Sequence, residues 1–164
     1  MKILNTALRA TAIAVLATMG SSFASAETIA RVMSPGAPIA ASAVVPASTR
    51  LIFLSGIVAS PLNPAIPKEL GDTKQQTLSI LTNMKSQLES LGSSMGNVVK
   101  ITVFLVGVPE NEGRMDRPAM NEVFRTFFGS AQQPNKPTRS TVQVAGLGDP
   151  GVLVEIEAIA AEVP

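Results

Sequence analysis

Charged side chains stand in two otherwise apolar segments near the C-terminus, residues 138–144 and 153–160. Arg139 is in the first segment, and Glu155 and Glu157 are in the second. The chain of 164 residues has no histidine, cysteine, tryptophan or tyrosine. Serine triads with histidine, thiolate nucleophiles and the usual zinc sites are therefore excluded. Any chemistry must use charged, hydroxyl or amide side chains or backbone groups, and we predict neither a metal site nor a cofactor.

The period of two in a β-strand sorts these two segments into faces. In the second segment, Glu155 and Glu157 share one face, opposite the apolar residues that alternate with them. In the first segment, one face carries Ser140, Val142 and Val144, and the other carries Arg139, Thr141 and Gln143. We expect the apolar faces to pack under helices and Arg139 to share the opposite face with Glu155. A sheet face of this kind can also be simply solvated, as in many open antiparallel sheets.

The segments before residue 117 divide into strands and connections. Residues 50–58 and 98–108 are rich in aliphatic, β-branched and aromatic residues, which is typical of strands. Residues 27–49 are rich in proline, alanine and serine and are expected to be extended and irregular. Proline punctuates residues 60–71, and charged residues dominate 109–116, so both are predicted to be loops.

Two helices are predicted between the strands. The first begins at Asp72 or Thr73 and ends at Gly92, and its apolar side recurs every three or four positions at Thr77, Leu78, Leu81, Met84, Leu88 and Leu91. The second follows Asp116 and ends before Gly129, with an apolar stripe of Met120, Val123, Phe124 and Phe127. That stripe is interpreted as core packing rather than an aromatic binding face. The pattern predicts an α+β fold, a sheet with two helices on one face.

Residues 1–26 have the features of a secretory signal peptide. A cationic start precedes a short apolar run, and Ala-Ser-Ala supplies a small-residue cleavage site before Glu27. The alternative, a membrane anchor, is disfavoured because the run is about half of the ~20 residues needed to span a bilayer. We therefore predict one domain over residues 27–164, periplasmic or secreted, with no membrane association after cleavage.

Removal of the signal peptide also changes the charge balance. It takes away two of the 13 basic residues, Lys2 and Arg9, so 11 remain against 12 acidic residues. The resulting net charge of −1 leaves no electrostatic footprint for nucleic acid, and we predict no nucleic-acid partner.

The order and spacing of several segments resemble the Rid (reactive intermediate deaminase, YjgF-type) family. They are LIFLSGIV, LTNMKSQLESLGSSMGNVVKITVFL, MNEVFRTFF, PTRSTVQVAGL and VEIEAIA, and together they span nearly all of the mature chain. The resemblance implies a chorismate-mutase-like mixed sheet with two helices packed on one face. It also implies a homotrimer with a small-molecule site in each cleft between subunits, which would cover the sheet face opposite the helices.

The same resemblance implies a hydrolysis of 2-imino or enamine acids to 2-oxoacids and ammonia. Arg139 matches the family's carboxylate-binding arginine, a role that suits the planar guanidinium fork. Glu155 matches the carboxylate that holds or activates water, and an ordinary Glu pKa of about 4.3 leaves it ionised as a base. Asn121 matches an asparagine near the site, and Thr141 occupies the position of a frequent cysteine.

Plainer roles compete with these assignments. Arg139 can be an interfacial ion-pair partner, Glu155 can satisfy that arginine structurally, and Asn121 can cap or buttress a loop.

The chain departs from the family pattern upstream of residue 50. Active deaminases of the family carry a Gly-Pro-Tyr stretch there, and Ala40, Ala41 and Ser42 occupy those three positions. Ser42 is thus the candidate to replace a catalytic tyrosine, although its side chain is shorter. General acid–base groups contribute typically ~10²–10⁴-fold to a rate, so this replacement matters. We keep two hypotheses: a deaminase with altered substrate scope, and a non-catalytic trimeric protein that binds small carboxylates.

Overall fold

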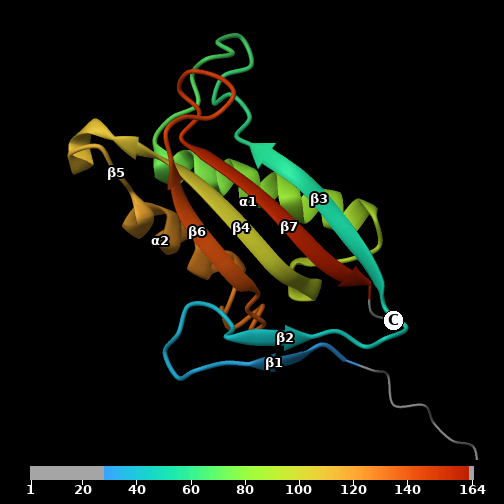
Figure 1. Ribbon diagram of the computed structural model, residues 1–164. Coiled ribbons are helices and arrows are strands. Elements are labelled where there is room, and N and C mark those ends of the chain that lie inside the picture. Colours follow the sequence, from blue (N-terminus) through green and yellow to red (C-terminus); the bar gives the residue numbers. More distant parts are fainter. Residues whose placement is uncertain (1–27, 163–164) are drawn as a thin grey trace, which may run out of the picture.

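Strand β7 (Val154–Glu162) is the central strand of the main sheet (Figure 1). It pairs antiparallel with β3 (Arg50–Val58) on one side and with β4 (Val98–Val108) on the other. Beyond β4, strand β6 (Thr138–Val144) runs parallel to β4 and forms the edge of the sheet in this chain. Near the end of β4, the short strand β5 (Arg114–Met115) pairs antiparallel with it. The predicted strands are confirmed, and the mixed sheet follows from the single parallel pair.

The computed structural model describes residues 28–162. The predicted signal peptide, residues 1–26, lies outside the described residues. Within the part of the chain that is described, neither helix has the length and apolar character required to cross a bilayer.

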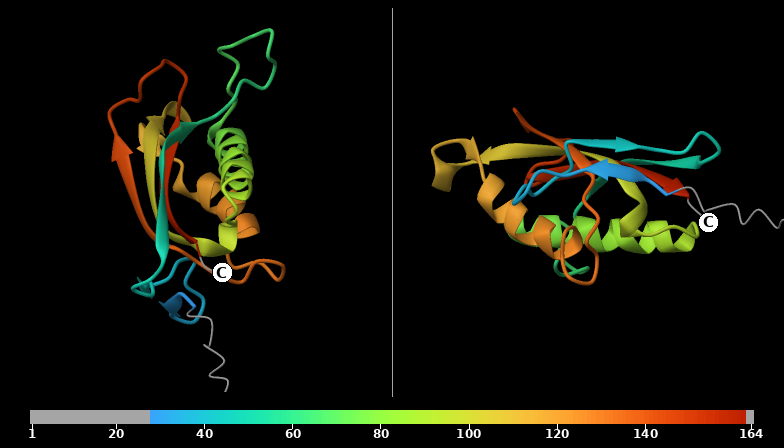
Figure 2. Two further views of the ribbon diagram at one scale, coloured as in Figure 1. Left: turned by 90° about the vertical axis from the view of Figure 1, so that its right-hand side faces the viewer. Right: turned by 90° about the horizontal axis from the view of Figure 1, so that it is seen from below.

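Two helices cover one face of the sheet, as Figure 2 shows in its edge-on view. Helix α1 (Thr73–Ser90) begins at Asp72, whose carboxylate accepts from the backbone N–H of Gln75, and the Gln75 side chain accepts in turn from the backbone N–H of Asp72. Helix α2 (Arg117–Phe127) begins at Asp116, whose Oδ1 accepts from the N–H of Ala119 at 3.0 Å. Both predicted helices are confirmed.

The core lies between the helices and the sheet. Its fully buried side chains come from both helices and from β4 and β7: Ile80, Leu81, Met84, Leu88, Met120, Phe124, Ile101, Leu105 and Ile156. The predicted stripe of α2 is confirmed as core, with Phe127 partly buried at its margin. Two members of the α1 stripe are exposed instead, Leu78 and Leu91, because the buried side of α1 includes Ile80 and Gln76.

Gln76 shows how a polar residue is accommodated inside this core. Its Nε2 donates to the carbonyls of Gly71 and Gly151, and its Oε1 accepts from the N–H of Leu153 at 2.8 Å. A buried amide with its partners satisfied carries little penalty. Gln76 therefore ties the start of α1 to the turn that enters β7.

The segment before β3 contains more structure than the sequence predicted. It forms a two-stranded antiparallel hairpin of β1 (Ala30–Val32) and β2 (Ser42–Val44), which lies at one end of the main sheet (Figure 1). The Arg31 side chain donates to the carbonyls of Gly96 and Val98, which anchors the hairpin to the start of β4. The expectation of irregular structure over 27–49 is corrected here: the apolar pattern is too short to indicate strands without these long-range bonds.

The predicted charged loop after β4 contains regular secondary structure over residues 109–115, a segment called the arm here. A 3-10 turn, η2 (Pro109–Asn111), leads into β5. The Gln143 side chain accepts from the N–H of Met115 and donates to the carbonyl of Gly113. A Cβ at Gly107 would lie 2.0 Å from that carbonyl oxygen, so the close approach of the arm requires glycine.

Candidate functional site

Arg139 lies on the face of β6 that is turned toward α2. The parallel register places Arg139 beside Ile101 and Thr141 beside Val103, and both partners on β4 are fully buried under the helices. Val142 lies on the opposite face beside Phe104 and is 42% exposed. The predicted faces of β6 are therefore reversed: Arg139 does not share the open face with Glu155.

The physical reason for the reversal is the set of contacts that α2 offers to the arginine. The Arg139 guanidinium donates to Oδ1 of Asn121 at 2.8 Å, and its Cζ lies 4.3 Å from the centre of the Phe124 ring. A planar guanidinium stacks well on an aromatic face, and its aliphatic stem tolerates burial. Parity alone indicated the wrong face, because Val142 and Val144 both lie on the face opposite Arg139, Thr141 and Gln143.

The electrostatic surroundings of Arg139 are strongly cationic. Burial first, and then the nearby positive charges of Arg117 and Arg125, together lower the pKa of Arg139 to about 10. Arg139 is still cationic at neutral pH. Both flanking arginines belong to α2, and sequence reasoning missed them. Their spacing was the available signal, since Arg117, Asn121 and Arg125 recur every four residues and share one side of the helix.

Thr141 is the next residue along β6 on the same face as Arg139. Its Oγ1 is buried and has no hydrogen-bond partner among the described residues. Buried hydroxyls are normally paired, so an unpaired one next to a cationic group is a candidate ligand contact. The structure thus places Arg139 and Thr141 on the side of β6 that faces α2, where Asn121 contacts Arg139.

Glu155 lies on the other side of the sheet. Its neighbours in register are Phe104 on β4 and Val58 on β3, and its side chain covers Gly56 so closely that a Cβ there would overlap the carboxylate. Because Arg139 faces the helices and Glu155 faces away from them, one copy of the chain does not bring the two residues into a single site.

Ser42 is placed at the hairpin end of β6. It begins β2 and is exposed, and the backbone N–H of Ala40 donates to the carbonyl of Pro137 at 3.0 Å. That bond joins the chain two residues before Ser42 to the chain two residues before Arg139. This backbone hydrogen bond is what brings the segment of Ser42 near the start of β6. Among the described residues, no hydrogen bond joins the side chains of Ser42 and Arg139.

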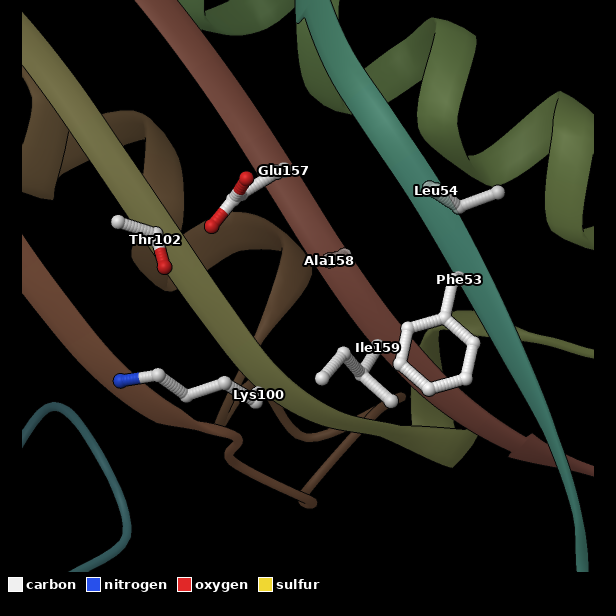
Figure 3. A pocket seen from close by; sticks show the side chains of 7 residues that line it. All are labelled: Phe53, Leu54, Lys100, Thr102, Glu157, Ala158 and Ile159. Atoms are coloured by element: carbon white, nitrogen blue, oxygen red, sulfur yellow. The ribbon is translucent and has the colours of Figure 1, made fainter.

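A shallow pocket of about 140 Å³ lies on the open sheet face (Figure 3). Lys100, Thr102 and Glu157 provide its polar wall, and Phe53 and Ile159 provide apolar surface. The Lys100 ammonium donates to the Ser140 hydroxyl at 2.7 Å. Phe53 is 71% exposed, so this face presents apolar surface to solvent in a single copy.

Among residues 28–162, no group of three or more acidic side chains gathers in a way that could hold a metal ion.

Comparison with known proteins identifies the relatives of this chain. The family model described as Endoribonuclease L-PSP matches residues 34–162. The chain belongs to the Rid/YjgF/L-PSP family. Protein HMF1 of Saccharomyces cerevisiae is 36% identical over 138 residues, 82% of this chain and 96% of that protein. The Escherichia coli protein named "Putative reactive intermediate deaminase TdcF" is 36% identical over 110 residues, 67% of this chain and 78% of that protein.

Solved structures of the Rid/YjgF/L-PSP family share this architecture. The Rid protein YyfB of Yersinia pestis matches with a TM-score of 0.62 at 25% identity, over 80% of this chain and 98% of that one. The structure of E. coli TdcF with bound serine matches with a TM-score of 0.55 at 34% identity, over 72% of this chain and 84% of that one. The predicted YjgF-type α+β fold is therefore confirmed.

No carboxylate pairs with Arg139 within residues 28–162, and this generates a stability prediction. Asn121→Asp would place a negative charge at the position that now accepts from Arg139, amid three arginines. We expect the free energy of unfolding to rise by about 1 kcal/mol, because a charge-assisted pair replaces a neutral acceptor and offsets like-charge repulsion. Guanidinium unfolding at pH 7 measures the change. Asn121→Leu, which removes the acceptor, is the control and is expected to be less stable than wild type; an Asn121→Asp variant no more stable than wild type would contradict the electrostatic account.

Proposed function

We propose that this chain is a Rid-type deaminase that hydrolyses 2-imino or enamine acids to 2-oxoacids and ammonia, with altered substrate scope. The observation that carries the proposal is Arg139: a half-buried guanidinium, oriented by Asn121 and Phe124, with no carboxylate partner among the described residues. A buried cation without a counter-ion is costly unless a ligand supplies one. The bound serine in the TdcF structure supports a ligand that carries a carboxylate.

In the proposed reaction Arg139 binds the substrate carboxylate and so fixes the neighbouring C=N carbon. Glu155 holds a water and takes one proton from it as the oxygen bonds to that carbon. Glu155 passes that proton to the imine nitrogen, which completes a carbinolamine. The carbinolamine hydroxyl then gives up its own proton, which Glu155 transfers to the nitrogen; the C–N bond breaks, ammonia leaves, and the C=O bond of the 2-oxoacid forms. Water is the only other reactant, so no metal or cofactor enters the balance.

The opposite orientations of Arg139 and Glu155 bear on how such a site is assembled. If both residues act on one substrate, Arg139 must come from one copy and Glu155 from another. A homotrimer with sites in the clefts between copies meets this requirement. The exposed apolar residues of the open face, Phe53 and Val142 among them, support burial of that face against other copies.

Ser42 and Thr141 are the residues that would alter the substrate scope. A serine hydroxyl at position 42 reaches less far than the phenol of active deaminases, which weakens polarisation of the substrate or positioning of water. Thr141 places an unpaired hydroxyl beside Arg139, where it can donate to a bound carboxylate or accept from an imine N–H.

A second function is favoured by one observation, the absence of tyrosine from the whole chain. Without the phenol, the proposed site at Arg139 could bind small carboxylates in a trimer without catalysing their hydrolysis. The family model's description names an endoribonuclease. We do not extend that activity to this chain, because the net charge of −1 of the predicted mature chain gives no overall electrostatic attraction for nucleic acid.

Deaminase activity on iminoacids formed in situ distinguishes the two functions. We expect wild type to accelerate release of the 2-oxoacid, Arg139→Gln to lower kcat/KM by about 10²-fold, and Ser42→Tyr to raise kcat, because a phenol restores the missing general acid. Turnover is measured by trapping the remaining imine against time. Lys85→Gln, on the exposed side of α1, is the matched control. No acceleration by wild type, combined with a carboxylate-induced thermal shift that Arg139→Gln abolishes, would leave the binding protein as the function.

Mixing of two inactive variants tests whether the site is shared between copies. Arg139→Gln and Glu155→Gln are each expected to be inactive, and trimers refolded from an equal mixture are expected to recover about a quarter of wild-type activity, since that fraction of clefts combines two intact residues. Activity after co-refolding is compared with activity after simple mixing of folded variants. Recovery without exchange of subunits, or none after confirmed exchange, would contradict a shared site.

We also propose export, with residues 1–26 removed as a signal peptide. N-terminal sequencing of the protein from the periplasm or medium of an expressing bacterium is expected to begin at Glu27, because cleavage follows Ala-Ser-Ala. An intact Met1 in the cytoplasmic fraction alone would contradict export.

A further inference from the structure

Three arginines lie close together where β6 meets α2. Arg139 reaches from β6 to Asn121 on α2, and Arg117 and Arg125 stand one helical turn before and after Asn121. Residues four apart lie on the same side of a helix, about 6 Å apart along its axis. Arg117 and Arg125 therefore flank the point where Arg139 meets α2.

None of these three arginines has an acidic partner within the described residues. The ion pairs over residues 28–162 involve other cations: Arg50, Lys74, Lys85 and Arg114. Glu122, the nearest acidic residue along α2, pairs with Lys74 of α1. Asp116 is engaged as the cap of α2.

The fold itself gives no reason for this grouping. Arg117 stands in the first turn of α2, where the helix dipole disfavours a cation, and the first turn has no acidic residue. Arg125 stands in the last turn, where the dipole accepts a cation, but it repels Arg139. Both arginines of α2 are exposed. A ligand with more than one negative group would compensate all three charges.

We propose that this arginine cluster selects a substrate with a second acidic group, a 2-imino dicarboxylic acid. Its 2-carboxylate binds Arg139 and its distal carboxylate binds Arg117 or Arg125. The inference rests on the proposed function and names the substrate class of that same site. The distal carboxylate takes no part in the hydrolysis, so the balance of the reaction is unchanged. The rise of about 6 Å between Asn121 and either flanking arginine suits a chain of four or five carbons.

Paired product analogues test the second acidic group directly. 2-Oxopentanedioate and 2-oxopentanoate have the same carbon chain, and only the first has a distal carboxylate. Isothermal titration of the wild-type protein is expected to give a Kd about tenfold lower for the dioate, the scale of one additional charged hydrogen bond. Raised salt is expected to reduce this difference, because the flanking arginines are exposed.

Variants separate the inference from the function on which it rests. Arg117→Gln with Arg125→Gln is expected to abolish the preference for the dioate and to leave the Kd for 2-oxopentanoate within about twofold. The double Arg→Lys variant keeps the charges and is expected to retain most of the preference. Arg139→Gln is expected to weaken both ligands, and Lys85→Gln neither.

Each other outcome overturns the inference in a distinguishable way. Equal Kd values for the two ligands with wild type overturn it alone, since carboxylate binding survives. Binding of neither ligand overturns it together with the proposed function. A changed oligomeric state in the double Gln variant, measured by light scattering, would assign the arginines to a contact between copies. Tight binding of a short RNA that displaces the dioate would assign them to phosphates.

Discussion

The stacking of Arg139 on Phe124, with its hydrogen bond to Asn121, is the interaction on which the site depends. It attaches the edge strand β6 to α2 and decides which face of β6 is turned inward. It also leaves a cation partly removed from water without a carboxylate nearby. Burial of a charge is tolerated best when partners compensate it, and this is the physical basis of the proposed carboxylate site at Arg139.

The parallel pairing of β6 with β4 makes this arrangement possible. It sets Arg139 beside Ile101 and Thr141 beside Val103, so that both residues lie on the same side of β6. The antiparallel pairing of β7 sends Glu155 to the open face. The two charged residues that the sequence places in neighbouring strands thus end on opposite sides of one sheet. A fold of this kind supports a shared site only through association of copies, which is why the exposed apolar face and the proposed function are linked.

The functional proposal rests on where the charged side chains lie and not on the fold alone, because one fold hosts many activities. Family membership and the TdcF structure with bound serine support a small carboxylate-bearing ligand. The missing tyrosine and the arginines of α2 distinguish this chain within that frame. They indicate a proposed site with more positive charge, and with fewer acid–base side chains, than the motif by itself implies.

The sequence by itself determined the main strands, the two helices and the α+β fold, and its motif predicted Arg139, Asn121 and Thr141 as site residues, because period, caps and motif are local properties. Only the tertiary structure decided that β1 and β2 form a hairpin, that Arg139 is turned toward α2, and that Arg117 and Arg125 surround it. Strand parity gives two faces but not which one is buried. That choice is made by the parallel register and by the aromatic and amide partners that α2 supplies across the edge of the sheet.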